Sequence, residues 1–149
     1  MAGPDDEDRP LDPTTGWVRE HLHRYVATDG ENGHDWRGAP TLLLTTRGRR
    51  SGSLRRTPLI YGRAGGDYVV VASVGGRPSN PGWFHNLLAE PDVTIQVMAD
   101  EMPAHARVAE GEERERLWAL MTGVWPAYDE YRARTTREIP VVVLETPGP

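Results

Sequence analysis

A cluster of arginines between two apolar stretches is the part of the sequence best suited to binding an anion. Residues 47–56 include five arginines and two glycines, and they separate the apolar runs Leu42–Leu44 and Pro58–Tyr61. This order predicts a strand, a tight basic turn and a second strand. Guanidinium groups bind phosphate and carboxylate through paired hydrogen bonds, and glycines let backbone N–H groups approach an anion. The predicted phosphate clamp consists of Arg49, Arg50, Ser51 and Arg55. A solvated hairpin tip that carries charge for solubility explains the same pattern equally well.

Two motifs further along the chain combine small residues with aromatic rings. Ser73 ends an apolar run and precedes Val74 and two glycines, so a flat ligand could approach the backbone closely there. Asn80 and Pro81 predict the N-cap and first residue of a short helix that ends at Ala89. A helix N-terminus attracts anions, and Trp83 could stack on a ring. An ordinary hairpin turn and a purely structural tryptophan are the competing interpretations.

Three aromatic residues share one predicted helical face. Trp125, Tyr128 and Tyr131 are spaced three residues apart, so they predict either a wall of a substrate pocket or plain core packing. His85 is expected to be a surface or structural residue. His21 and His23 point to different sides of a helix, and the sequence therefore predicts no metal site.

The composition narrows the class of protein. The chain of 149 residues is the usual size of one domain, and the absence of cysteine excludes a disulfide framework and a thiolate metal site. A net charge of −5 argues against general binding of nucleic acid. The sequence contains no run of about 20 apolar residues that could form a membrane span, and its polar, acidic N-terminus does not resemble a signal peptide. A cytoplasmic protein is therefore expected. Residues 1–13 are expected to be a disordered acidic tail, and residues 14–149 a single domain.

The pattern of elements predicts a mainly β protein of the α+β class. A helix at 14–28 is expected to pack on the body of the protein, with contact to a membrane surface as the alternative. About six antiparallel strands follow, with short helices between them. The expected strands lie at 41–46, 55–63, 68–73, 93–98, 102–108 and 139–144, and the expected helices at 81–89, 110–121 and 124–134. Runs of strands without a regular alternation with helices indicate a small antiparallel barrel with helices at its rim.

Four motifs occur together in one order, and the chain resembles the deazaflavin-dependent nitroreductase family over roughly residues 36–145. The motifs are Thr45–Leu59, Ala72–Gly76, Asn80–Leu87 and Pro126–Tyr131. The resemblance implies a split β-barrel of the FMN-binding type. It also implies a reductase that passes a hydride from reduced coenzyme F420 to a quinone, an enone or a nitro compound.

The resemblance implies a role for each matching residue. Arg49, Arg50, Ser51 and Arg55 should hold the phosphodiester and acidic tail of the cofactor. The deazaflavin ring should lie along Pro58, Leu59, Ile60, Val71, Ala72, Ser73, Val74, Gly82, Trp83, Phe84, His85 and Asn86. The substrate pocket should include Ser73, Trp125, Tyr128 and Tyr131, with Tyr128 between cofactor and substrate. Tyr128 is the first candidate for the proton donor and Ser73 the second. Val74 and Trp125 depart from the family, in which lysine and tyrosine are common at these positions.

Other functions fit parts of the sequence. An FMN-dependent oxidoreductase and a non-catalytic F420-binding protein would use the same fold. A nucleic-acid-binding barrel is disfavoured because the aromatic residues are segregated from the arginines. The expected partner is a small-molecule hydride acceptor, the expected assembly is a monomer or a homodimer, and peripheral membrane contact through the first helix stays open.

Overall fold

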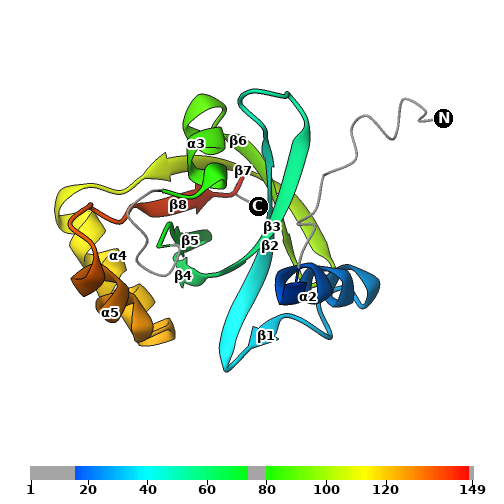
Figure 1. Cartoon of the computed structure of the whole chain (residues 1–149), viewed down its shortest axis with the longest axis horizontal. Coiled ribbons are helices and arrows are strands. Elements are labelled where there is room, and N and C mark those ends of the chain that lie inside the picture. Colours follow the sequence, from blue (N-terminus) through cyan, green and yellow to red (C-terminus); the bar gives the residue numbers. More distant parts are fainter. Residues whose placement is uncertain (1–15, 74–79, 148–149) are drawn as a thin grey trace.

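Eight strands form one antiparallel sheet that curls into a barrel, with helices on its outside (Figure 1). The computed structural model describes residues 16–73 and 80–147. The strands are β1 (Asp35–Trp36), β2 (Ala39–Arg47), β3 (Leu54–Ile60), β4 (Gly62–Ala64), β5 (Asp67–Val71), β6 (Asp92–Val97), β7 (Asp100–Val108) and β8 (Val141–Glu145). The helices are α2 (Gly16–Ala27), α3 (Gly82–Ala89), α4 (Gly111–Val124) and α5 (Ala127–Arg134). None of the described helices is long and apolar enough to cross a bilayer.

The barrel closes through a bend between β3 and β4. The sheet runs in the order β1-β2-β6-β7-β8-β5-β4, and β3 pairs with the other edge of β2. Tyr61 alone separates β3 from β4, so one bent strand pairs with β2 in its first part and with β5 in its second. At the bend, the Tyr61 backbone N–H donates to the Pro40 carbonyl at 3.1 Å. If β3 and β4 count as one strand and the two-residue β1 is set aside, six strands form the ring. This confirms the predicted split antiparallel barrel.

The apolar run Leu42–Leu44 is buried on both faces of β2. Leu42 and Leu44 belong to the barrel core, whereas Leu43 packs outside the barrel against Leu22 and Tyr25 of α2. All five side chains are at most 1% exposed, and the Tyr25 hydroxyl donates to the Thr41 carbonyl at 3.1 Å. The helix that the sequence predicted at 14–28 therefore packs on the body of the protein.

The valine-rich strands β5 and β8 are buried on both faces in the same way, on the opposite side of the barrel. Val70 and Val142 point into the barrel core, whereas Val69, Val71 and Val143 pack outward against α4 and α5. The side chains that these two helices contribute to the outer cluster are Leu117, Trp118, Met121 and Tyr128. Helix α2 lies on one side of the barrel, and α4 and α5 lie on the other (Figure 1). Residues of α2 and α5 line one cavity, which is described below.

Several local predictions were wrong, and at Trp125 the reason is local, because the following Pro126 disfavours helical backbone. Between the strands expected at 93–98 and 102–108 the sequence predicts a turn at 100–101, but the β6–β7 turn consists of Met98 and Ala99, and residues 100–101 belong to β7. On α4, the spacing of Leu117, Leu120 and Met121 predicts that all three face inward, but Leu120 is 37% exposed, whereas Trp118 is buried. Trp125 lies between α4 and α5 rather than on one continuous helix with Tyr128.

The predicted N-cap at Asn80 was also wrong. Helix α3 begins at Gly82, and Pro81 stands at the N-cap position without a side-chain cap bond. The Asn80 carboxamide oxygen instead accepts a hydrogen bond from Arg137 at 2.6 Å. The predictions for the tail at 1–13, for the first two residues of the helix at 14–28, and for Val74 fall outside the described residues, and the division into tail and domain stays a prediction.

Candidate functional site

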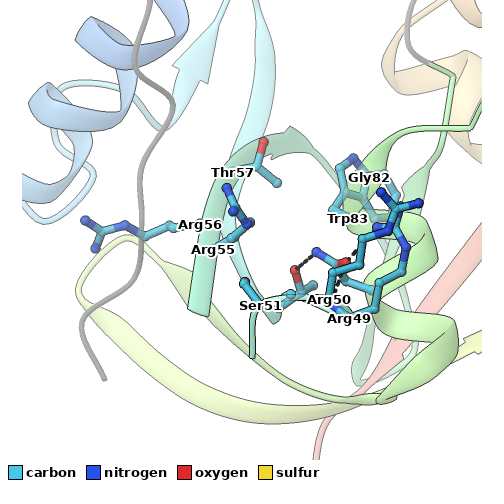
Figure 2. Close-up of a pocket in the computed structure, with 11 residues that line it drawn as sticks. Arg49, Arg50, Ser51, Arg55, Arg56, Thr57, Gly82 and Trp83 are labelled. Atoms are coloured by element: carbon cyan, nitrogen blue, oxygen red, sulfur yellow. Dashed lines mark hydrogen bonds between the residues drawn. The ribbon is translucent and has the colours of Figure 1, made fainter. Parts of the chain in front are cut away.

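The basic turn and the start of α3 enclose a cavity of about 460 Å³ (Figure 2). Its lining consists of Thr46, Gly48, Arg49, Arg50, Ser51, Arg55, Arg56, Thr57, Gly82, Trp83 and Asn86. All four predicted clamp residues therefore line one cavity. Figure 2 shows Arg49 and Arg50 on the side of α3, Arg55 across from them on β3, and Arg56 directed away from them. We call this space the basic cavity.

Local backbone bonds fix the shape of the turn between β2 and β3. Gly48 N–H donates to the Ser53 carbonyl at 2.7 Å, and Gly52 N–H donates to the Gly48 carbonyl at 2.8 Å. Gly52 has a φ of +76°, which favours glycine, and a Cβ on Gly48 would lie 2.8 Å from the Ser51 hydroxyl oxygen. The backbone N–H groups of Arg50 and Ser51 donate to no other group in the described part of the chain. These donors are available to an anion in the basic cavity.

Asn86 connects the turn to α3. Its carboxamide oxygen accepts from the Arg49 backbone N–H at 3.2 Å and from the Arg49 guanidinium at 3.0 Å. Its amide nitrogen donates to the Thr46 hydroxyl at 3.2 Å. Because Asn86 is 4% exposed and its polar atoms are used in these three bonds, it fixes the position of Arg49.

A second, mainly apolar cavity of about 540 Å³ lies next to the basic one. Its lining consists of Val18, His21, Trp36, Thr41, Thr57, Pro58, Leu59, Ile60, Val71, Ser73, Pro81, Trp83, Trp125, Tyr128 and Tyr131. We call this space the aromatic cavity. Thr57 and Trp83 line both cavities, so the two spaces adjoin. All four predicted substrate residues are in this lining. Of the predicted ring neighbours, Ala72, Phe84 and His85 are outside the lining of both cavities.

Tyr128 presents a hydroxyl group to the aromatic cavity. The residue is 4% exposed, and its hydroxyl makes no hydrogen bond within the described residues. Every fully buried side-chain N or O atom of those residues has a partner, so this hydroxyl must be open to the cavity. Burial raises the pKa of Tyr128 well above its usual value, and the nearby Tyr131 raises it further. The phenol is therefore protonated at neutral pH and can donate.

Two other aromatic side chains are held close to Tyr128. The ring centroids of Tyr128 and Tyr131 are 6.1 Å apart, and Trp125 Nε1 donates to the Tyr131 hydroxyl at 3.5 Å. Trp125 also packs on Trp36, with 5.1 Å between ring centroids. The three residues that the sequence placed on one helical face therefore do meet, although Trp125 lies outside the helix.

Arg137 is a supporting residue that the sequence gave no reason to single out. Its guanidinium donates to the carbonyls of Ala72 at 3.2 Å and Ser73 at 2.8 Å, and to the Asn80 side chain at 2.6 Å. Burial lowers its pKa, because the charged form loses hydration. Arg137 thus ties the end of β5 to the approach to α3, two parts of the chain that border the aromatic cavity. The sequence shows only a lone arginine before the last strand.

His21 was also missed, although a signal was present. It stands three residues after Val18 and four before Tyr25, which places it on the same face of α2. It is 4% exposed and lines the aromatic cavity. A polar residue on the apolar face of a helix is the pattern that would have indicated it.

Fold and site together define a class of protein. An antiparallel split barrel with arginines and free N–H groups in one cavity, and aromatic rings in the next, suits a cofactor with an anionic tail and a flat ring. Comparison with known proteins agrees with this class. Residues 17–146 match the model of the F420H(2)-dependent quinone reductase family. The chain belongs to this family of oxidoreductases.

Individual relatives support the same assignment. The chain is similar to an F420H(2)-dependent quinone reductase of Mycobacterium tuberculosis, with 42% identity over 131 residues, 85% of this chain and 88% of the relative. It is similar to the solved structure of an F420-H2 dependent reductase, with a TM-score of 0.67 and 43% identity, over 71% of this chain and 94% of that one. A further solved structure, described as a domain-swapped dimer, has a TM-score of 0.69 and 40% identity, over 87% of this chain and 97% of that one.

Proposed function

We propose that this protein is an F420H2-dependent quinone reductase in which the two adjoining cavities hold one cofactor molecule. The observation that carries the proposal is the shared lining at Thr57 and Trp83. A cofactor with its anionic tail in the basic cavity could extend its ring past these residues into the aromatic one. The family match favours F420 over the FMN that the sequence left open.

Each cavity would hold a different part of the cofactor. Charged side chains and free N–H groups of the basic turn would bind the anionic tail, through Arg49, Arg50, Ser51 and Arg55. Pro58, Leu59, Ile60, Val71 and Trp83 would lie beside the ring. Bound F420H2 would supply a hydride equivalent, and the protein contributes orientation and the exclusion of water.

A proton must reach the acceptor after the hydride. Tyr128 is the proposed donor, because its hydroxyl opens on the aromatic cavity and is protonated at neutral pH. Ser73 lines the same cavity and is the second candidate. Trp125 and Tyr131 would bound the space for the acceptor, for which we propose a quinone, an enone or a nitro compound.

The proposed assembly is a homodimer, in keeping with the domain-swapped dimer found for a structure 40% identical. Light scattering during size-exclusion chromatography tests it, since a single monomeric species at micromolar concentration would contradict it. The cytoplasmic location stays a prediction from the sequence.

Titration of the purified protein with oxidised F420 and with FMN tests the cofactor. Trp83 lies at the junction of the cavities, so quenching of tryptophan fluorescence should report binding. Each charge-assisted hydrogen bond contributes about 1.5–3 kcal/mol, so Arg49→Ala and Arg50→Ala should each weaken F420 binding by about tenfold or more. The control is Arg24→Ala, an exposed arginine of α2 outside both cavities. Absence of F420 binding by the wild type at micromolar concentrations would refute the proposal.

A further inference from the structure

His21 has one ring nitrogen in use and the other open to the aromatic cavity. Its Nε2 lies 2.6 Å from the Gly33 carbonyl oxygen, which can only accept, so Nε2 carries the proton of this bond. Nδ1 of the neutral ring is then an acceptor, and it has no partner within the described residues. Since no fully buried side-chain nitrogen of those residues lacks a partner, Nδ1 must be accessible. With the residue 4% exposed and lining the aromatic cavity, the accessible atom faces that space.

His21 lies at the end of the aromatic cavity that is farthest from the arginines of the basic cavity. His21 Nε2 shares the Gly33 carbonyl with the Thr41 hydroxyl, which donates to it at 2.6 Å. Thr41 pairs with Ile60 in the β2–β3 ladder, whereas Thr57 is at the boundary with the basic cavity. Ile60 is three positions further along the strand than Thr57, so their Cα atoms are roughly 10 Å apart. A molecule that enters beyond the cofactor ring would reach His21.

The surroundings of Nδ1 make it selective. Val18, three residues before His21 on α2, lines the same cavity, as does Trp36, and both offer apolar contact. An acceptor atom there stays unpaired when the ligand brings only apolar groups or carbonyl oxygens, and that loss of hydration disfavours binding. A ligand with a hydroxyl or amino group at this end would satisfy the atom.

We propose that His21 Nδ1 accepts a hydrogen bond from a hydroxyl or amino group of the hydride acceptor, so that acceptors with such a donor are preferred over their apolar analogues. This inference rests on the proposed reductase function, because it names the class of acceptor for the same site. The Gly33 bond fixes the tautomer, in the way that a second partner orients a functional histidine elsewhere.

The test compares 2-hydroxymethyl-1,4-naphthoquinone with 2-methyl-1,4-naphthoquinone, which share a ring and differ by one hydroxyl group. Binding of each is measured by calorimetry on the cofactor-free protein, and kcat/KM of each with F420H2. The wild type should prefer the hydroxymethyl compound by about three- to tenfold in both, the range expected of one hydrogen bond. In His21→Phe the ratio should fall to about one, with F420 affinity unchanged.

The controls separate recognition from folding. His23→Gln changes an exposed histidine two residues further along α2 and should keep the preference. If His21→Phe fails to fold, His21→Leu replaces it, because leucine is smaller and also offers no acceptor to the ligand. A preference that survives in the folded His21 variant, or is absent from the wild type, overturns the inference. Preferential binding without F420H2-dependent turnover would instead sustain it and contradict the proposed function.

Discussion

Asn86→Ala should both destabilise the protein and loosen the basic turn. The substitution removes a buried amide that makes two hydrogen bonds to Arg49 and one to Thr46. At about 1 kcal/mol for each of the two neutral bonds, and about 1.5 kcal/mol for the bond to a guanidinium that is partly exposed to solvent, the loss is about 3.5 kcal/mol. In a domain of this size that lowers the melting temperature by about 7–14 °C. Urea unfolding at 25 °C measures the change directly.

The same substitution should also weaken F420 binding, because Asn86 lines the basic cavity and holds Arg49 in place. Arg49, released from Asn86, would have to be ordered on binding, at a cost of about 1 kcal/mol, which is roughly a fivefold higher Kd. Asn86→Asp supplies a contrast: its carboxylate still accepts from Arg49, so it should lose less stability. Its charge, however, should repel an anionic tail and weaken binding more than alanine does.

Leu88→Ala is the matched control on the same helix. Leu88 is 55% exposed, so its removal should change the free energy of unfolding by at most about 0.5 kcal/mol. An Asn86→Ala protein with wild-type stability would refute the claim that the three hydrogen bonds of Asn86 stabilise the fold. Lowered stability with unchanged F420 affinity would show that Asn86 serves folding alone.

Four further predictions follow from the same geometry. Tyr128→Phe should lower kcat for quinone reduction by about a hundredfold with little change in F420 affinity, and an unchanged kcat would place the proton donor elsewhere. Burial raises the pKa of Tyr128, as it does for Tyr25 and Tyr61, so the folded protein retains phenol protons that the unfolded chain loses above about pH 10. The free energy of unfolding should therefore fall as the pH rises above 10, and urea titrations should show a shallower fall in Tyr128→Phe. Gly48→Ala should weaken F420 binding, because its Cβ would lie 2.8 Å from the Ser51 hydroxyl oxygen, while Gly66→Ala, which meets nothing within 4 Å, should not. Arg137→Met should lower kcat/KM by about tenfold or more, since it releases Ser73, and millimolar methylguanidinium should restore part of it; without such recovery, Arg137 would act only in folding.

Much of the fold could be predicted from the sequence, because the patterns that indicate strands and helices are local. Five of the six predicted strands each overlap one observed strand. The other, predicted at 55–63, spans β3 and β4, whose bend at Tyr61 closes the barrel. The errors at Asn80 and at the β6–β7 turn share a cause. In both cases the sequence offered an acceptable cap or turn, but the Asn80 side chain bonds Arg137 and the Met98 N–H donates to the Tyr25 hydroxyl of α2.

The sequence by itself determined the basic turn, because Arg49 to Arg55 are neighbours along the chain and a tight turn brings neighbours together whatever surrounds it. Only the tertiary structure decided what lies around that turn. Asn86 reaches Arg49 across 37 positions and Arg137 reaches Ser73 across 64. His21 meets the aromatic cavity only because α2 packs on β2. Such contacts depend on strand register and helix packing, which are set by the burial of the whole core and by no single stretch of sequence.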